Sequence, residues 1–400
     1  MSTKPLVTSA ILKVAGRCNI NCTYCYMYNL ADQTFRQQPG VMSRRTVDAA
    51  FGWAERYLEA TGLEDFHFSL HGGEPLLAGK SLIDYIADRR EAAQARTGRK
   101  ISLSLLTNGL LLDDEWLDLF CRRGIRFGLS IDGPREYHDR FRLTRGGEGT
   151  HRQVEEKIRW IQSSPKGLKS FSSVLCVLHP DMDGRRLLHY FVGLGLDGVD
   201  FLLPDQNHLH GSDSYPRPGP SPTYGLVLAD AYRAWRELDD PSFHVRKFAM
   251  IIAALFGKTP SLDSLGTGPI TVFTIETSGE VEPVDTLKAC GHGYTKSGVN
   301  IKDVAAAEVN ELPLIRMGLH KSETLPPKCQ ACAFKSLCGG GYLPHRFGER
   351  GFELETVYCA DMLHLCEVIY EDVASAVRSA RARLPRPPAP GARPAPQPSS

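Results

Sequence analysis

Hydrophobic positions in the first half of the chain follow two alternating periods. Up to about residue 204, short apolar runs are separated by segments whose apolar residues recur at helical spacing. The segment from Val47 to Leu58 has this helical spacing, and Gly62 follows it where a C-terminal cap is expected. Gly98 and Gly124 are expected to end the next two helices in the same way. The predicted strands span 9–15, 66–70, 101–107, 125–131, 171–178 and 199–203.

Six strand–helix units in series predict a parallel sheet with right-handed crossovers. Six units are too few for a closed barrel of eight strands, so we expect an open α/β fold, a partial (β/α)6 TIM-like barrel. In such a sheet, functional side chains gather at the carboxyl ends of the strands. The residues that follow each predicted strand are therefore the first candidates for chemistry.

The pattern changes after this region. A Pro- and Gly-rich connection over 204–222 precedes helical patterns at 223–238 and 243–256. A hairpin follows, in which TVFTI and VEPVDTL flank the turn ETSGE, and then a loop-rich segment with six cysteines from Cys290 to Cys366. The predicted domains are a core (1–204), a helical bridge (205–265), a small cysteine-rich domain (266–370) and a disordered Pro/Arg-rich tail (371–400).

Composition narrows the class of protein. The chain has 400 residues and a net charge of +1, so its charge indicates neither a nucleic-acid partner nor a membrane surface. The apolar N-terminal segment is too short for a signal peptide or a membrane span. The 11 cysteines are clustered and unevenly spaced in a large chain, which favours metal ligation in a reducing cytoplasm over disulfides.

Three cysteines, Cys18, Cys22 and Cys25, follow the first predicted strand with the spacing C-x3-C-x2-C. An iron–sulfur cube held by three cysteines keeps one iron free for a substrate or cosubstrate. Tyrosines interleave the motif, as expected for a centre shielded from water. A zinc knuckle, which would need a fourth ligand here, and chance spacing are the alternatives. Cys121 and Cys176 lie in apolar patterns and are expected to be small buried hydrophobes.

Polar residues also end the next three predicted strands. His71-Gly72-Gly73-Glu74-Pro75 follows the second strand, Asn108 ends the third, and Ser130 and Asp132 end the fourth. The two glycines allow close backbone approach, and the proline fixes a turn. Alternation directs His71 into the barrel, where it either lines a reaction chamber or holds the loop through a hydrogen bond. Ordinary turn chemistry is the alternative for the third and fourth strand ends.

Together these motifs resemble those of the radical S-adenosylmethionine (SAM) superfamily. The resemblance implies that the free iron binds the amino and carboxylate groups of SAM. Reductive cleavage of SAM then gives a 5′-deoxyadenosyl radical, which takes a hydrogen atom from a substrate. The resemblance also implies that the GGEP segment presents backbone carbonyls to the SAM amino group.

Further SAM contacts follow from the same resemblance. Arg142, in DRFRLTR, matches the arginine that binds the SAM carboxylate, and an arginine suits that task through paired hydrogen bonds. Ser130 and Asp132 would lie near the ribose and methionyl parts, and Leu203 would pack on the adenine. Asn108 joins this cofactor-binding set because of its place at a strand end.

A second cysteine cluster lies near the C-terminus and consists of Cys329, Cys332, Cys338 and Cys359. Its spacing resembles the SPASM extension of peptide-modifying radical SAM enzymes. The resemblance implies one auxiliary [4Fe-4S] cluster with all four ligands present. A four-cysteine zinc site is the alternative. In either case the loop-rich segment has a small apolar core and is expected to depend on a metal to fold.

The region departs from a full SPASM domain, which carries a second, inner auxiliary cluster. One inner ligand position is occupied by Tyr342 and another by Val284, and neither residue binds iron through sulfur. We therefore expect a single auxiliary cluster and no inner one. Cys290 and Cys366 are left over and could replace only part of the inner ligand set.

Asp285 lies at the end of the predicted hairpin. In the related anaerobic sulfatase-maturing enzymes, the matching aspartate is the proposed catalytic base. A carboxylate that faces the barrel mouth could accept a substrate proton if burial raised its pKa. The alternative is an aspartate that only stabilises the turn. Asp285 and His71 are the candidate catalytic residues.

The segments SLHGGEPLLAG, GEVEPVDTLK and CGGGYLPHR resemble the maturases that form three-residue cyclophanes in ribosomal peptides. This resemblance implies that a β-carbon radical attacks an aromatic ring two residues earlier, which gives a carbon–carbon crosslink. An anaerobic sulfatase maturase, which makes formylglycine, is an alternative against which the missing inner ligands count. A thioether-forming or epimerising maturase is another. From a different class, an iron–sulfur electron carrier or zinc-scaffold protein would share the cysteine motifs.

The implied partners are a ribosomal precursor peptide and an electron donor such as flavodoxin or ferredoxin. Because the first predicted strand begins near residue 9, we expect no leader-binding domain before the barrel. Precursor binding is then expected on the barrel–SPASM surface, for example by strand addition, or through a separate protein. The auxiliary cluster would either relay the surplus electron or only stabilise its domain.

Overall fold

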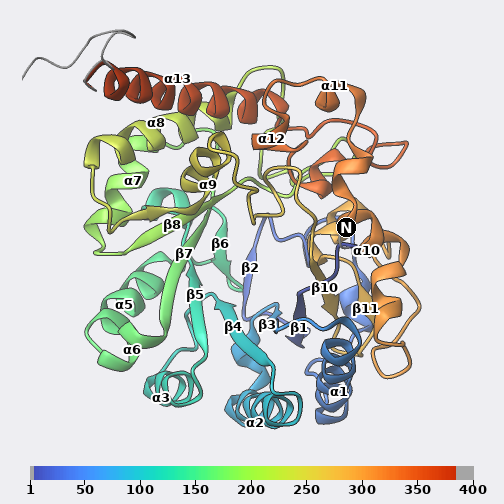
Figure 1. Cartoon of the computed structure of the whole chain (residues 1–400). Coiled ribbons are helices and arrows are strands. Elements are labelled where there is room, and N and C mark those ends of the chain that lie inside the picture. The colour runs from blue at the N-terminus through green and yellow to red at the C-terminus, as the bar shows by residue number, and fades with distance from the viewer. Residues whose placement is uncertain (1–3, 384–400) are drawn as a thin grey trace, which may run out of the picture.

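The computed structural model describes residues 4–383, and a curved, nine-stranded sheet lies at its centre (Figure 1). Its strand order is β11-β10-β1-β3-β4-β5-β7-β8-β9. The six central strands are β1 (Ser9–Ala15), β3 (Asp65–Gly72), β4 (Lys100–Thr107), β5 (Arg126–Ser130), β7 (Phe171–Val177) and β8 (Gly198–Leu202). These six strands pair in parallel, which confirms the predicted partial (β/α)6 barrel.

Helices cover the outer face of this sheet (Figure 1). They are α1 (Arg44–Thr61), α2 (Lys80–Thr97), α3 (Asp114–Arg123), α5 (His151–Gln162), α6 (Pro165–Ser170) and α7 (Gly184–Gly193), and the short helix α4 (Arg135–His138) follows β5. Gly62, Gly98 and Gly124 end α1, α2 and α3 in the left-handed conformation, with φ of 72°, 65° and 62°. Glycine adopts this conformation without strain, so the helix ends predicted at these positions are confirmed.

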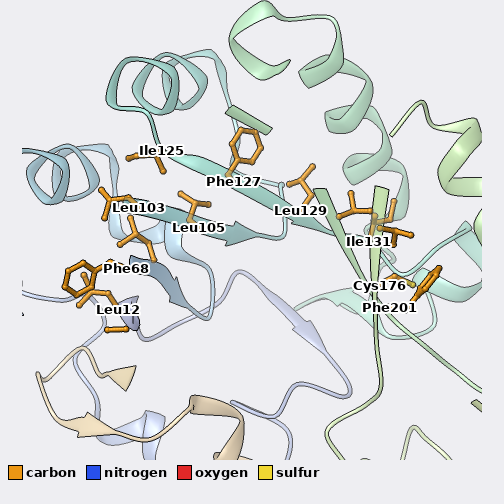
Figure 2. Packing of buried hydrophobic residues seen from close by; sticks show 14 of the residues in the cluster. Leu12, Phe68, Leu103, Leu105, Ile125, Phe127, Leu129, Ile131, Cys176 and Phe201 are labelled. Carbon is orange, nitrogen blue, oxygen red and sulfur yellow. The ribbon is translucent and has the colours of Figure 1, made fainter. Parts of the chain in front are cut away.

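Side chains alternate across the barrel strands, as the sequence pattern predicts. In β3, Phe66 and Phe68 are fully buried beneath the helices, and the Phe68 ring lies 4.8 Å from that of Phe51 on α1. On the inner face, the His67 ring forms a hydrogen bond with Ser102 of β4. Figure 2 shows the apolar layer continuing across the strands through Leu103, Leu105, Phe127 and Leu129. The core therefore lies between sheet and helices, and the barrel interior carries the polar side chains.

The predicted hairpin is present, and the fold shows where it docks. β10 (Val272–Ile275) and β11 (Val281–Glu282) pair antiparallel as expected. β10 also pairs in parallel with β1, so the hairpin extends the barrel sheet. The sequence pattern instead predicts this hairpin as part of the cysteine-rich domain, 266–370. At the opposite edge, β9 (His244–Val245) pairs with β8.

The described part of the C-terminal half contains three longer helices and many short elements. The predicted helices are present as α8 (Thr223–Leu238) and α9 (Arg246–Leu255). The short elements are η3 (Asp285–Cys290), η4 (Ala307–Glu311), α10 (Pro313–Leu319), η5 (Lys321–Thr324), α11 (Pro327–Gln330), α12 (Lys335–Cys338) and η6 (Leu343–Arg346). The last helix, α13 (Cys359–Arg383), lies along α8 at the top of Figure 1. Between residues 4 and 383, no helix has the length and apolarity to cross a membrane.

Helix α13 corrects the predicted start of the tail at residue 371. The helix continues to Arg383, because its Ala- and Arg-rich sequence favours helix formation. Asp372 anchors this part to α8, since it accepts hydrogen bonds from Tyr232 at 2.5 Å and Arg236 at 2.8 Å. The rest of the predicted tail, residues 384–400, lies outside the described residues.

The two cysteines expected in the apolar core differ. Cys176 in β7 is fully buried, as predicted. Cys121 on α3 is only partly buried, which corrects the prediction. It follows Phe120, which faces the core, and therefore stands at the edge of the apolar face of the helix.

Candidate active site

The three cysteines of the first motif lie in one loop that follows β1. β2 (Ile20–Cys22) pairs antiparallel with β6 (Arg142–Thr144), and this pairing places Cys22 opposite Arg142. The Cys25 amide donates to the Cys22 carbonyl at 3.0 Å, so the chain turns back between these two cysteines. All three cysteines line a cavity of about 180 Å³, here called the cysteine cavity. The fold therefore brings together the thiols that the spacing singled out.

Burial raises the pKa of each thiol in this cavity. The pKa of Cys25 rises to about 12 and that of Cys18 to about 11. Thiolates are stable here only beside compensating positive charge, such as the irons of a cluster. Within the described part of the chain, no group of three or more His, Cys, Asp or Glu side chains is arranged to hold a single metal ion.

A buried carboxylate fixes the glycine-rich segment after β3. Glu74 is fully buried and accepts hydrogen bonds from the amides of Leu76 at 3.0 Å and Asn108 at 2.9 Å. The Thr107 hydroxyl donates to the same carboxylate at 2.7 Å. Glu74 thus connects the segment to the carboxyl end of β4. Its role is to hold the segment in shape, because the side chain lies outside the cysteine cavity.

The two glycines of this segment pack against the cysteine loop. A Cβ on Gly73 would lie 2.1 Å from the Tyr28 hydroxyl and 2.6 Å from the Arg17 carbonyl oxygen. A Cβ on Gly72, where φ is 146°, would lie 2.0 Å from the Ala15 carbonyl oxygen. No larger residue fits at either position. Both glycines line the cysteine cavity, so their backbone is accessible to a bound ligand.

A buried hydrogen-bond network in the wall of the cysteine cavity links Asp132, Tyr24 and Arg142. Tyr24 donates to Asp132 Oδ2 at 2.6 Å, and its hydroxyl accepts a hydrogen bond from Arg142 Nη1 at 2.7 Å. The Val177 amide donates to Asp132 Oδ1 at 2.9 Å. The Nε of Arg142 is buried and has no hydrogen-bond partner among residues 4–383. The guanidinium therefore has a donor left for an acidic ligand.

The remaining predicted cofactor contacts fall into two groups. Asn108 and Ser130 line the cysteine cavity, and the Asn108 side chain donates to Asn19 Oδ1 at 2.8 Å. Leu203 instead lines a neighbouring cavity, and Leu202 lines both. β8 ends at Leu202, so this residue is better placed than Leu203 to contact a ligand beside the cysteines.

The neighbouring cavity, here called the outer chamber, has a volume of about 290 Å³. Its walls come from the barrel and from the C-terminal half: Tyr24, Tyr26, His71, Asp205, Asp285, Lys247, Asp263, Tyr342 and His345 are among them. Several residues line both cavities, among them Tyr24, Tyr26, His71 and Asp205. A ligand in the outer chamber would therefore lie next to a ligand in the cysteine cavity.

Asp285 lies in the chamber wall, within a buried ion pair. It pairs with Lys13 and accepts a hydrogen bond from Tyr26 at 2.6 Å. Burial would raise the pKa of Asp285, but the Lys13 ammonium and the neighbouring His71 outweigh it and lower the pKa below its ordinary value. The condition under which Asp285 could accept a substrate proton, a pKa raised by burial, is therefore not met. The carboxylate is held ionised and is a weak base.

Sequence reasoning missed Lys13. It is fully buried in the middle of β1, on the inner face of the barrel, and its Nζ lies 3.0 Å from His71 Nδ1. Burial, and then the Lys13 charge, lower the pKa of His71 to about 4, so the ring is neutral. Nδ1 accepts from the ammonium, which places the ring proton on Nε2. A lysine inside an apolar strand, SAILKVA, was the available signal.

Residues 12–189, which supply most of the lining of the cysteine cavity, match the sequence profile of the Radical SAM superfamily. The chain contains a radical SAM domain. A cysteine-type anaerobic sulfatase-maturating enzyme from Clostridium perfringens is 26% identical over 367 residues, which cover 88% of this chain and 93% of the relative. These similarities identify the chain as an enzyme.

Two solved structures share the fold of the radical SAM domain and of the region that follows it. The structure of anSMEcpe with bound AdoMet and Cp18Cys peptide matches with a TM-score of 0.77 and 23% identity, over 93% of this chain and 99% of that one. Streptococcus suis SuiB bound to precursor peptide SuiA matches with a TM-score of 0.57 and 14% identity, over 89% of this chain and 76% of that one.

The residues of the radical SAM domain suit the cofactors that this family uses. Three thiols whose pKa is raised by burial need cationic partners, which a [4Fe-4S] cube would supply. The free Nε of Arg142 suits the carboxylate of SAM. Gly72 and Gly73 leave the backbone open to the same cavity. The donor set therefore fits a three-cysteine cluster with SAM beside it.

The second group of cysteines also converges in the fold. Cys329, Cys332, Cys338 and Cys359 come from α11, α12, the turn between them and the start of α13. The pKa of Cys338 is raised to about 12, first by burial and then by the charges of the other three thiols, against the opposing charge of Lys321. The four sulfur atoms are thus near enough to interact, as ligands of one cluster would be.

The two positions where the sequence lacks inner-cluster ligands, Val284 and Tyr342, lie in different surroundings. Val284 packs in a core with Ile270, Leu287, Cys290, Leu343, Phe347 and Phe352. The Tyr342 hydroxyl forms a hydrogen bond with Thr286 at the chamber wall. Cys366 is fully buried in the main core. Both leftover cysteines, Cys290 and Cys366, are therefore packed among apolar side chains.

Proposed function

We propose that this enzyme modifies a peptide substrate by SAM radical chemistry and forms a carbon–carbon crosslink between an aromatic ring and the β-carbon of a residue two positions later. A peptide or protein substrate is supported by relatives named for maturing sulfatases and by fold neighbours solved with bound peptides. The crosslink is the finer part of the proposal. It is supported by the subgroup motifs and by the apolar positions described below.

When bound, SAM and the [4Fe-4S] cube supply a 5′-deoxyadenosyl radical that removes a hydrogen atom from the substrate. Cys18, Cys22 and Cys25 would hold the cube, and Arg142 would bind the SAM carboxylate through its unpaired Nε. Tyr24 orients Arg142 by accepting a hydrogen bond from Nη1, so the guanidinium is fixed before the ligand arrives.

The outer chamber is the proposed site of the substrate residues. It adjoins the cysteine cavity, and its volume of about 290 Å³ suits one or two side chains of a peptide. Tyr24, Tyr26 and Tyr342 present aromatic faces that would orient an aromatic substrate ring and exclude water. His71 lines both cavities, and its ring is held by Lys13, which pairs in turn with Asp285.

The observation that carries the crosslink over other chemistry is the apolar core at the inner cluster positions. Val284 lies in this core, and Tyr342 lines the chamber beside it, where a full SPASM domain would place ligands to iron. We propose a single auxiliary [4Fe-4S] cluster held by Cys329, Cys332, Cys338 and Cys359. That cluster would relay the surplus electron or stabilise the domain.

A sulfatase-maturing activity is the second candidate. It is favoured by the relatives, because those that share more than four-fifths of the chain include both cysteine-type and serine-type sulfatase-maturating enzymes. In that reaction the substrate is a Cys or Ser of a sulfatase, and the product is formylglycine. Both candidates oxidise the substrate by two electrons, so product structure must separate them.

The proposed partners are a ribosomal precursor peptide and a one-electron donor such as flavodoxin or ferredoxin. The precursor would bind on the surface between the barrel and the cysteine-rich region, where the outer chamber lies, or through a separate protein. The donor would reduce the cluster at the cysteine cavity. Neither partner is expected to be a nucleic acid, since the chain has a net charge of only +1.

The test is anaerobic reconstitution with iron and sulfide, followed by SAM, a reductant and a candidate precursor. We expect 5′-deoxyadenosine and a peptide that has lost two hydrogens per crosslink, with fragmentation blocked between the linked residues. Reaction of the product with an aldehyde probe would instead favour formylglycine, and a one-unit gain from deuterated solvent would favour epimerisation. Absence of 5′-deoxyadenosine from the loaded protein would overturn the proposal, and Cys22→Ala is the inactive control.

A further inference from the structure

Asp205 lies where the two cavities meet. It is the third residue after the end of β8 at Leu202, and it lines both the cysteine cavity and the outer chamber. Carboxyl ends of parallel strands are the places where side chains reach a bound substrate. Asp205 therefore lines both cavities, as His71 does, whereas Asp285 lines only the outer chamber. No sequence motif includes Asp205.

The carboxylate of Asp205 is not engaged by a cation. Among residues 4–383, no lysine or arginine forms an ion pair with it. The basic nitrogen that approaches it is His345 Nε2, at 4.0 Å. The two other carboxylates of the chamber differ in this respect. Asp285 is paired with Lys13, and Asp263 accepts a hydrogen bond from Tyr342. Asp205 is therefore the chamber carboxylate that is available to a substrate.

His345 faces Asp205 from the C-terminal half and has an unsatisfied ring nitrogen. Its side chain is buried, and Nε2 has no hydrogen-bond partner in the part of the chain that the structure describes. The neutral ring carries a proton on one nitrogen and a lone pair on the other. Tyr358 donates to the Pro204 carbonyl, at 2.8 Å, which fixes this corner.

A carboxylate oxygen without a cation and an unpartnered ring nitrogen therefore face one another across 4.0 Å in the chamber wall. At this distance the two atoms do not satisfy one another, so both are open to hydrogen bonds with a substrate. From this geometry we infer that Asp205 and His345 form a proton-accepting site for the substrate, in which Asp205 takes the proton that the substrate loses during its oxidation. The inference rests on the proposed function and adds a catalytic residue to it.

The charges around Asp205 suit this task. Burial, together with the negative charges of Asp285 and Asp263, raises the pKa of Asp205 to about 7. Burial and the Lys247 charge lower the pKa of His345 to about 3, so this ring stays neutral and does not ion-pair with Asp205. A base is most effective when its pKa lies near the working pH, which holds for Asp205 and fails for the ionised Asp285.

The step balances as follows for the crosslink. The 5′-deoxyadenosyl radical removes one hydrogen atom from the β-carbon, and the new carbon–carbon bond leaves a radical on the aromatic ring. Restoring aromaticity requires loss of the ring hydrogen as one proton and one electron. Asp205 accepts the proton and becomes a neutral carboxylic acid. The electron passes to a one-electron acceptor of the iron–sulfur class.

The decisive variant is Asp205→Asn, which removes the acid–base function and keeps the shape. We expect crosslink formation to fall by about 100-fold, while 5′-deoxyadenosine formation stays within about threefold, so that SAM cleavage becomes uncoupled from product. Asp205→Glu should restore part of the coupling, and this recovery would not occur for a purely structural role. Asp213→Asn is the matched control, because it removes the same charge from an exposed position in the same connection.

A second measurement does not depend on turnover. Infrared titration of the reconstituted protein without SAM, across about pH 5 to 9, should detect a carboxylic acid that ionises near pH 7 in the wild type and not in Asp205→Asn. Wild-type coupling and pH profile in Asp205→Asn, or no such titration, would overturn the inference and leave the proposed function intact. Failure of the wild type to make 5′-deoxyadenosine would overturn the proposed function alone, since the titration still tests Asp205.

Discussion

Arg142 is the cross-strand partner of Cys22. The two residues pair in the small antiparallel sheet of β2 and β6, so the backbone sets the distance between a predicted cluster ligand and a predicted SAM ligand. Residues paired in this way have Cα atoms about 4.5–5.5 Å apart, a spacing that side-chain motion does not change. A cluster and the carboxylate of SAM would therefore be positioned by one rigid element.

Loss of this arginine should weaken SAM binding more than it affects folding. We expect Arg142→Met to raise the SAM dissociation constant by about 10- to 100-fold, because a charge-assisted hydrogen bond is lost in a buried cavity. Equilibrium dialysis with the reconstituted protein would measure it. Arg140→Met is the control, since Arg140 is half-exposed and pairs with Asp181. An equal loss in both variants would contradict the assignment of Arg142.

The Lys13–Asp285 pair should contribute strongly to stability, because both partners are buried. Lys13→Met leaves Asp285 without its cation, and we expect it to lower the free energy of unfolding by about 3–5 kcal/mol. Lys13→Met/Asp285→Asn should recover much of this loss, because the uncompensated charge is then removed. Lys328→Met is the control: its pair with Glu355 is exposed and should contribute about 1 kcal/mol or less. Urea unfolding would measure all three variants.

Lys13→Met should also reverse the sign of the contribution that Asp285 makes to the pH dependence of stability. In the wild type, the pKa of Asp285 is lower in the folded state than in the unfolded state. The stability from this group is therefore complete above the unfolded pKa of about 3.8 and is lost as the pH falls below it. Without Lys13, burial dominates and raises the folded pKa, so acidification should favour the folded state of Lys13→Met through this group. Unfolding curves at successive pH values would detect the change of sign.

Buried neutral histidines should make the protein sensitive to mild acid. Burial lowers the pKa of His71 to about 4, of His345 to about 3 and of His138 to about 2. Because the unfolded chain binds these protons below about pH 6.5, stability should fall from there downward, by about 1.4 kcal/mol per pH unit for each group. His138→Gln should remove the share of one such group, about 1.4 kcal/mol per pH unit. His189→Gln, at an exposed position on α7, should leave it unchanged.

Iron content should distinguish one auxiliary cluster from two. We expect about eight irons per chain in the reconstituted wild type, as two cubes require, and about four in Cys338→Ala. Cys290→Ser should keep about eight, because Cys290 packs in the apolar core with Val284. About twelve irons in the wild type, with loss of four in Cys290→Ser, would contradict the single auxiliary cluster. Zinc in place of iron would contradict both clusters.

Local pattern was sufficient for the barrel and for the residues at its strand ends. Alternation in FHFSL places Phe66 and Phe68 under the helices and His67 inside, since side chains of a strand point to opposite faces. Glycines in the left-handed conformation end three helices where the sequence predicts. The three thiols Cys18, Cys22 and Cys25 line one cavity, because all three lie in one short loop.

Predictions that depended on long-range contacts were less accurate. A base role for Asp285 requires a pKa raised by burial, and a lysine 272 residues earlier in the chain lowers that pKa instead. The hairpin was recognised, but its pairing with β1 was not, because an edge strand carries no local record of its partner. The helix through residues 371–383 was missed, since its anchor on Tyr232 and Arg236 is again remote in sequence.

The sequence by itself determined which side chains face the barrel interior, where the helices end and which thiols lie within one loop. These properties depend on steric preferences and periodicity within a few residues. Only the tertiary structure decided which groups are ionised: Asp285 beside Lys13, neutral His71 next to both, and Asp205 without a cation at the joint of two cavities. Charge states in a buried site depend on the field of every neighbouring group, and those neighbours meet only when distant segments of the chain pack together.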